Sequence, residues 1–319
     1  MDDTGQKLLS RRVPNDPGAL LGQLEPFGPR LKVVVEATFN WYWLVDLLED
    51  HGLEVTLAHP LYLKAIAYAK VKTDKVDAHT LAQLLRLGYI PEAWICPREL
   101  RATRDLVRRR NRLVNVRAGL LRDVQIQLMK ANVRLGRNEV KAIDGRHLRR
   151  LLDHPHARRV GLAYLHTIEA LTREIRDLDA EIRRSLRRSK PILLLESLPG
   201  IGRTLAATIH METGPIDRFA SAKNYCSYCR VAPTISQSGS VTRRGRNSKQ
   251  GNRHLEWAFS QAANLAIQHY PPIKALHQRL LCKKKKRILA KAIVTHKLAH
   301  AAYHVLHKEQ PFEMEMMTS

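Results

Sequence analysis

The fold of this chain is decided largely by residues 31–58, LKVVVEATFNWYWLVDLLEDHGLEVTLA. The β-branched run at residues 31–36 is typical of a buried strand. Asn40 can cap a helix with apolar side chains at helical spacing, and Gly52 would end that helix. Residues 54–58 predict a second strand, and residues 74–87 predict another helix. This alternation of strand and helix predicts an α/β layer with a largely parallel sheet.

Two carboxylates stand three residues apart at the start of the later helix, in VKTDKVDAHTLAQLLRLG at residues 71–88. Asp74 and Asp77 would share one helix face. Two acids that face one point suit a divalent-metal site on an enzyme that cleaves phosphodiesters, because Mg²⁺ prefers hard oxygen ligands. Glu36 ends the first predicted strand, at the edge where open α/β sheets place ligands. The simpler alternative is that Asp74 only caps the helix.

The chain is strongly basic. Its 319 residues include 54 Lys and Arg against 30 Asp and Glu, a formal net charge of +24. Such an excess favours binding to nucleic acid through the phosphates. No apolar run approaches the roughly 18 residues of a membrane-spanning helix, so we expect no membrane partner. No signal peptide is visible and the 4 cysteines fit a reducing compartment, which together predict a cytoplasmic, nucleoid-associated protein.

Long helical runs follow from about residue 98 to residue 190. Residues 101–122 hold eight arginines and one acid, which makes phosphate contact more plausible than a merely solvated helix face. The candidates for this contact are Arg108, Arg109 and Arg110. Residues 168–186 carry apolar side chains at heptad-like spacing, suited to an antiparallel helical hairpin or to a dimeric coiled coil.

Residues 195–210, LESLPGIGRTLAATIH, have the composition of a helix-hairpin-helix. Gly200 and Gly202 would expose backbone N–H groups at a helix N-terminus, which is a ready phosphate site. A simple packing corner between two helices uses similar residues, so this alternative stays open.

Residues 224–254 predict a small, flexible and basic loop suited to contact with a nucleic-acid backbone. Several serines lie in it, and a serine near a bound phosphate can act as a nucleophile if another group activates it. An ordinary solvated surface loop is the alternative. The cations expected to contact nucleic acid here are Arg243, Arg244, Arg246, Lys249 and Arg253.

Four motifs occur in order and at fitting distances: VVVEAT with Glu36, KTDKVDA at residues 72–78, LPGIG at residues 198–202, and P-x4-SG at residues 233–239 followed by SKQGN. Together they resemble the DEDD-type insertion-sequence transposases, family one-ten, known as bridge-RNA-guided recombinases. The resemblance runs from near residue 8 to about residue 312. It implies a RuvC-like (RNase H-fold) DEDD domain at residues 1–97 and a helical, coiled-coil region at residues 98–190. An α-rich C-terminal transposase domain, with the helix-hairpin-helix-like segment and a catalytic serine, would occupy residues 191–319.

The resemblance also implies a site and a function. Glu36, Asp74 and Asp77 match the second, third and fourth acids with which the family binds Mg²⁺, and Ser238 matches the catalytic serine. The implied function is DNA transposition, in which Ser238 attacks DNA and forms a transient phosphoserine link while Mg²⁺ stabilises charge on the phosphate. The implied partners are donor DNA, target DNA and a structured guide RNA encoded by the element. A homo-oligomer, a dimer or a tetramer, is expected because two strands must be processed.

One departure from the family pattern affects the expected activity. The family's first acid stands in a Gly-x-Asp strand upstream of the glutamate, and nothing in this sequence matches it. Residues 2–15 predict instead the second strand of that domain, with its preceding turn at Asp2 and Asp3, so the RuvC-like domain is expected to be truncated. With three of the four acids, this form is expected to cleave DNA poorly or not at all. Two alternatives therefore stay open: a catalytically inactive DNA/RNA-binding remnant, and a metal-dependent junction nuclease that does not use the serine.

Overall fold

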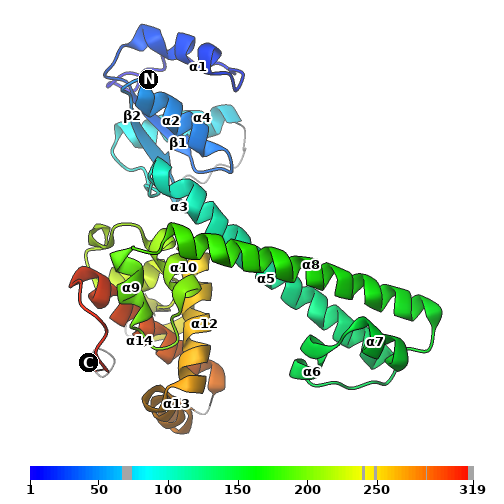
Figure 1. The fold of residues 1–319 in the computed structure, drawn as a ribbon. Coiled ribbons are helices and arrows are strands. Elements are labelled where there is room, and N and C mark those ends of the chain that lie inside the picture. The colour runs from blue at the N-terminus through cyan, green and yellow to red at the C-terminus, as the bar shows by residue number, and fades with distance from the viewer. Residues whose placement is uncertain (67–73, 239–240, 248–249, 285, 315–319) are drawn as a thin grey trace. The chain divides into compact units, whose positions relative to one another are not determined.

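The computed structural model describes residues 1–66, 74–238, 241–247, 250–284 and 286–314 of the chain. The chain divides into two compact units, Met1–Cys96 and Pro97–Ser319. Helices make up most of the described part, and its strands form two sheets of two strands each (Figure 1).

The unit Met1–Cys96 is built on a parallel pair of strands. Strand β1 (Lys32–Glu36) pairs with strand β2 (Glu54–Ala58), and helix α2 (Trp41–Asp50) connects them. Val45 and Leu48 on α2 are buried together with Val35 and Leu57 of the strands. Gly52 follows α2 with a φ of 73°, a conformation that favours glycine, so it ends the helix as its position predicts.

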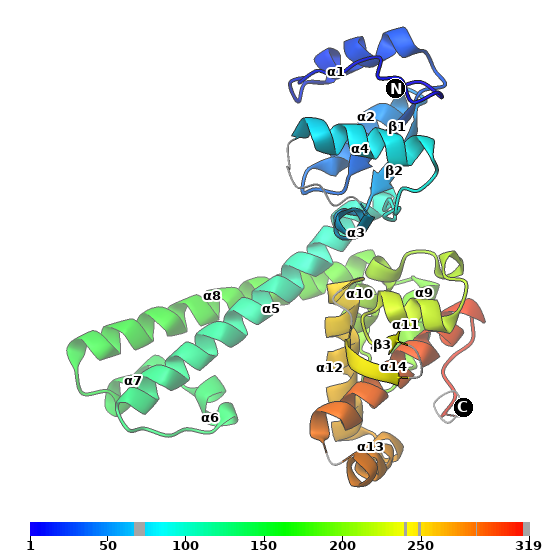
Figure 2. The ribbon, with the colours of Figure 1, turned by 180° about the vertical axis from the view of Figure 1, so that it is seen from behind.

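Helix α4 (Asp74–Arg86) packs against β1 within the same unit (Figure 2). Helix α3 (Pro60–Ile66) follows β2 in the chain, while helix α1 (Pro17–Leu24) and the 3-10 turn η1 (Glu25–Phe27) precede β1. Residues 54–58 and 74–86 thus form the strand and the helix expected of them.

The strand predicted within residues 2–15 is absent, so that prediction is wrong. Asp2 does form the expected turn, since its Oδ1 accepts hydrogen bonds from the backbone N–H groups of Thr4 and Gln6 at 3.0 and 2.8 Å. Leu8 and Leu9 beyond the turn are exposed. A strand is stabilised by a buried apolar face and a paired backbone, and this segment buries no such face.

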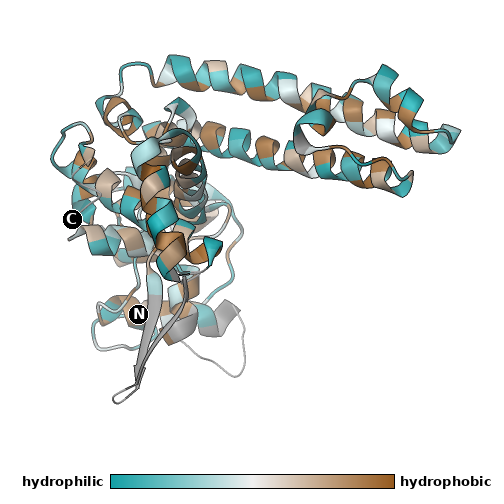
Figure 3. Ribbon diagram, turned by 90° about the horizontal axis from the view of Figure 1, so that it is seen from below, coloured by the Kyte–Doolittle hydropathy of each residue, from teal (hydrophilic) through white to brown (hydrophobic). Residues whose placement is uncertain are grey.

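The unit Pro97–Ser319 begins with a hairpin of two long helices, α5 (Arg98–Lys130) and α8 (Pro155–Ser185). Arg110 bonds to Asp179 and, seven residues later, Arg117 bonds to Thr172, so the two helices run antiparallel. Apolar residues recur along both helices between hydrophilic ones (Figure 3). Two short helices, α6 (Arg137–Ala142) and α7 (Gly145–Leu151), connect the two long ones. The apolar residues at heptad-like spacing in α8 therefore belong to a helical hairpin that α8 forms with α5 of the same chain.

The rest of this unit is a helical bundle around one core. Tyr225 and Phe259 are fully buried, and alanines let the bundle's helices approach closely. Helices α9 (Lys190–Glu196) and α10 (Arg203–Thr213) are followed by the turn η2 (Ile216–Arg218) and by α11 (Ala222–Tyr228). After the second sheet come α12 (Arg253–His269), α13 (Pro271–Lys284) and α14 (Arg287–His307).

The loop predicted at residues 224–254 is instead largely regular, so that prediction is wrong. Strands β3 (Pro233–Ser238) and β4 (Val241–Asn247) form an antiparallel hairpin between α11 and α12. The sequence contains β-branched residues on each side of Gly239-Ser240, at positions 234, 235, 241 and 242. Such residues favour paired strands around a two-residue connection.

No helix among the described residues is both long enough and apolar enough to cross a membrane.

Candidate functional site

Glu36 is the last residue of β1, at the edge of the sheet where the sequence placed it. It is in register with Ala58, and the backbone N–H of Ala37 donates to the carbonyl oxygen of Ala58 at 3.0 Å. The Glu36 side chain is half-buried. The carboxylate therefore stands on a regular element, which limits its freedom of orientation.

Asp74 and Asp77 lie in the first turn of α4, the helix that packs against β1. Asp77 is half-buried, while the side chain of Asp74 lies outside the described part of the structure. Among the side chains that are described, no three His, Cys, Asp or Glu groups are arranged to hold a metal ion. The backbone thus brings the element of Glu36 beside the element of the two aspartates, and all three donors are the hard oxygens that suit Mg²⁺.

Phe39 is a residue of this region that the sequence reasoning missed. It lies three residues after Glu36 and is 98% exposed. Its neighbours form a polar loop, in which the Thr38 hydroxyl donates to Asn40 Oδ1 at 2.9 Å. Trp41, by contrast, is buried and meets Tyr42 edge-on at 4.5 Å between ring centroids, so it serves packing. An apolar residue between two polar ones just before a helix was the only signal for Phe39 in the sequence.

Ser238 is the last residue of β3, and its Cα is paired with that of Val241 on β4. Arg243 is paired with Ser236, and Arg244 with Ile235. Arg246 also lies on β4, but the side chains of the hairpin lie outside the described part of the structure, as does Lys249 altogether. Arg253 is exposed at the start of α12. The acids lie in the unit Met1–Cys96 and Ser238 lies in the unit Pro97–Ser319.

A connected set of polar contacts lies where the chain leaves the hairpin of β3 and β4. Glu212 on α10 accepts two hydrogen bonds from Arg108 on α5, at 2.5 Å from Nε and 2.8 Å from Nη2. Asn252, directly before α12, donates from Nδ2 to Glu212 at 2.8 Å. We call Arg108, Glu212 and Asn252 the hairpin clamp. Burial alone would raise the pKa of Glu212, but the hydrogen bonds and charge of Arg108 outweigh it and hold that pKa below its ordinary value.

The three arginines expected to contact phosphates have different surroundings. Arg108 is bound in the hairpin clamp, and Arg110 forms a two-pronged ion pair with Asp179 at 2.9 and 3.0 Å. Arg109 is exposed. Two of the three guanidinium groups thus stabilise contacts between helices, and Arg109 is the one presented to solvent.

The two glycines of residues 198–202 have different roles. Gly200 is buried with a φ of 77°, and a Cβ there would lie 2.3 Å from the carbonyl oxygen of Ala262 on α12. Only glycine fits this close approach, so Gly200 serves packing between the turn and α12. Gly202 is exposed and precedes the first residue of α10. Of the two, Gly202 is the position where backbone N–H groups can meet an anion.

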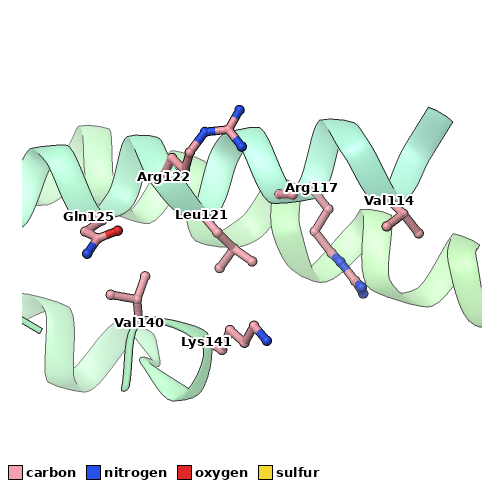
Figure 4. Close-up of a pocket in the computed structure, with 8 residues that line it drawn as sticks. Val114, Arg117, Leu121, Arg122, Gln125, Val140 and Lys141 are labelled. Carbon is pink, nitrogen blue, oxygen red and sulfur yellow. The ribbon is translucent and has the colours of Figure 1, made fainter. Parts of the chain in front are cut away.

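A cavity of about 460 Å³ lies between α5 and α6 in the helical hairpin (Figure 4). Arg117 and Lys141 contribute positive charge to its lining, and Leu121 and Val140 contribute apolar surface (Figure 4). Arg122 also lines the cavity, with its guanidinium on the side of α5 turned away from α6 (Figure 4). None of its described lining residues is acidic. Cations around an apolar floor suit an unpaired nucleotide, whose phosphate meets the cations and whose base covers the apolar side chains.

Two family models match separate parts of the chain. The DEDD transposase model of the IS110 type matches residues 1–132, which include Glu36, Asp74 and Asp77. The model described as the transposase IS116/IS110/IS902 family matches residues 193–278, which include Ser238 and Asn252.

Several proteins of known name are similar to this chain. An uncharacterized protein of the insertion element IS116 from Streptomyces clavuligerus is 25% identical over 85% of this chain and 82% of its own length. A pilin gene-inverting protein of Moraxella bovis is 26% identical over 89% of this chain and 82% of its own length. Two proteins of Sinorhizobium fredii that are named among transposases, y4qE and y4rJ, are 27% and 28% identical. The chain spans 58% and 66% of the length of these two relatives. The matched motifs, both family models and these relatives all point to the IS110 family of transposases, which this chain resembles.

Proposed function

We propose that this protein is a DNA transposase or recombinase of an insertion sequence, which cleaves and exchanges DNA strands under the guidance of an element-encoded RNA. The observation that carries the proposal is that the two family matches include the residues for both parts of the proposed chemistry, the metal site and the nucleophile. One contains the three acids and the other contains Ser238. The name of the Moraxella relative states that it inverts a gene, which is a DNA rearrangement of the same kind.

In the proposed reaction the Ser238 hydroxyl oxygen attacks a DNA phosphorus. The bond from phosphorus to the leaving sugar oxygen breaks, the serine proton passes to a base or to solvent, and a phosphoserine link holds the cut strand. A hydroxyl of another DNA end then attacks the same phosphorus and frees the serine, which exchanges the strands. Glu36, Asp74 and Asp77 would hold Mg²⁺, which when bound supplies positive charge to the phosphate.

The domain assignment follows from the same family. We assign a RuvC-like fold to residues 1–97, a helical, coiled-coil region to residues 98–190 and the transposase domain to residues 191–319. Donor DNA, target DNA and a guide RNA fit the net charge of +24. Since two strands must be processed together, we propose that the active form is a dimer or a tetramer.

A strand-exchange assay tests this function. The purified chain is incubated with element-end DNA, target DNA and the element RNA, with Mg²⁺ or with a chelator. We expect recombinant DNA to form slowly, because three of the four family acids are matched, and to depend on both RNA and Mg²⁺. The alternative is a family member that binds nucleic acid without cleaving it, which the match to only three of the four family acids favours. Tight binding without any cleaved or joined product would establish that alternative.

We expect Phe39→Ala to weaken binding to single-stranded DNA by about 1–3 kcal/mol, the usual effect of removing a base-stacking aromatic. The reason is that Phe39 is 98% exposed beside Glu36, where DNA must come to reach the acids. Fluorescence anisotropy measures the affinity, and thermal unfolding checks that stability is unchanged. Phe39→Trp should retain the affinity. Tyr89→Ala removes another exposed aromatic, at 67% exposure, and should have the smaller effect. Equal losses in both alanine variants would contradict a stacking role for Phe39.

We expect the double variant Arg122→Gln with Lys141→Gln to lower the affinity for RNA. The logarithm of the binding constant should also fall less steeply with the logarithm of the salt concentration, by a slope of about 2, one for each lost phosphate contact. Both residues line the cavity between α5 and α6. The matched control is Arg149→Gln with Arg150→Gln, which removes two exposed charges from α7, outside the cavity lining. Because both variants lose the same net charge, equal slopes would show that the cavity makes no particular contact.

A further inference from the structure

The hairpin that carries Ser238 is fixed at its base by contacts on both of its ends. Before β3, Arg230 donates from Nε to the carbonyl oxygen of Gly251 at 2.9 Å. After β4, the backbone N–H of Asn252 donates to the carbonyl oxygen of Tyr228 at 2.6 Å. A Cβ at Gly251 would lie 2.4 Å from that same Tyr228 oxygen, so only glycine permits this approach. The entry and exit of the hairpin therefore meet in one place.

Asn252 joins this base to the helices. Its Oδ1 accepts from the backbone N–H groups of His254 and Leu255 at 2.8 and 3.2 Å, which caps α12. Its Nδ2 donates to Glu212 on α10. One carboxamide thus uses its acceptor for α12 and its donor for α10, which sets its orientation.

Glu212 extends the connection to α5. Its side chain is 2% exposed, and an unpaired carboxylate at that burial would be strongly unfavourable. Arg108 supplies both nitrogens of its planar fork, an arrangement that accepts one relative orientation of the two groups. An apolar contact of the same size would fill the space but would not fix the orientation of α5 relative to α10. The charged pair fixes this orientation as well as packing the two helices together.

We propose that Glu212 and Asn252 are positioning residues, which hold the hairpin bearing Ser238 in a set orientation on helices α5 and α10. This inference rests on the proposed role of Ser238. A nucleophile must stand about 3–3.5 Å from the atom that it attacks, and a displacement of about 1 Å lowers the rate about 100-fold. The clamp acts through the backbone of the hairpin and touches no substrate.

The test uses Asn252→Asp in the full chain. Aspartate still caps α12, but it loses the donor to Glu212 and opposes one carboxylate with another. We expect faster hydrogen exchange of the backbone amides of β3 and β4, and a rate of adduct formation at saturating DNA that falls by about 10- to 100-fold. DNA affinity should change by less than about threefold, because phosphate contacts dominate it. The variant Asn252→Ser also keeps a helix-capping side chain and loses the donor to Glu212, but it adds no carboxylate, so it should show faster exchange and a lower rate to a smaller extent.

Asp179→Asn is the matched control. It weakens another, partly buried ion pair of α5, the one with Arg110, whose contacts in the described part of the structure do not include the hairpin base, so stability should fall while hairpin exchange stays unchanged. Wild-type exchange and rate in both Asn252→Asp and Asn252→Ser would overturn the clamp. If the unaltered chain forms no adduct, the proposed role of Ser238 fails, and the exchange of the hairpin amides still decides whether the clamp orients it.

Discussion

Ser238→Ala should abolish the covalent protein–DNA adduct and leave DNA and RNA affinity within about twofold of the unaltered chain. One hydroxyl contributes little to binding that is dominated by phosphate charge, whereas the phosphoserine link cannot form without it. Denaturing electrophoresis of labelled DNA measures the adduct, and anisotropy measures the affinity. Long incubation at saturating DNA allows a slow reaction to be seen, which matters because three acids, rather than four, match the family.

Ser236→Ala is the control for this result. Ser236 lies two residues before Ser238 on β3, so its replacement tests the same strand without touching the proposed nucleophile. It should still form adduct. An adduct that persists in Ser238→Ala and disappears in Ser236→Ala would move the nucleophile to the earlier serine.

Asp77→Asn should lower the cleavage rate by at least about tenfold at ~1 mM Mg²⁺, and the defect should shrink as the Mg²⁺ concentration rises. The amide keeps one oxygen donor but loses the negative charge that attracts a hard cation. The rate of strand cleavage against Mg²⁺ concentration measures the effect. Removing the metal with a chelator should stop cleavage in every variant.

Glu49→Gln serves as the control for Asp77→Asn. Glu49 is an exposed acid on α2, so this variant loses one negative charge from the same unit away from the proposed site. Its dependence on Mg²⁺ should match that of the unaltered chain. A defect in Asp77→Asn that no Mg²⁺ concentration reduces would argue against a metal-ligand role for Asp77.

Local elements of this fold could be predicted because their determinants are close together in the sequence. The β-branched run at residues 32–36 forms β1, and the helix that starts at Asp74 ends at Arg86. The hairpin β3–β4 was missed because serine, glycine and arginine dominate its composition and obscure the strand-forming residues at positions 234–235 and 241–242. The strand predicted within residues 2–15 is absent for another reason. A strand needs a partner strand, and the local sequence does not reveal whether a partner is present.

The roles of individual site residues depended on contacts that are distant in the chain. Arg108 looked like one of many phosphate-binding arginines, yet its guanidinium meets Glu212, which is 104 positions away in the sequence. Gly200 suggested a phosphate turn, but the space that it occupies is set by the backbone of α12. Patterns of charge and glycine thus selected segments but could not assign a role to each residue within them. Burial and pairing in the structure then divided the described residues of each segment into those that hold the fold and those that are exposed to solvent.

The most direct test of the account is to locate the covalent link. The chain is incubated with element-end DNA, RNA and Mg²⁺, the adduct is isolated under denaturing conditions, and its protein is digested for mass spectrometry. We expect the DNA phosphate on the peptide that contains Ser238, with fragmentation placing it on that side chain. A phosphate on any other residue, or cleaved DNA without a protein-linked intermediate, would contradict the serine mechanism.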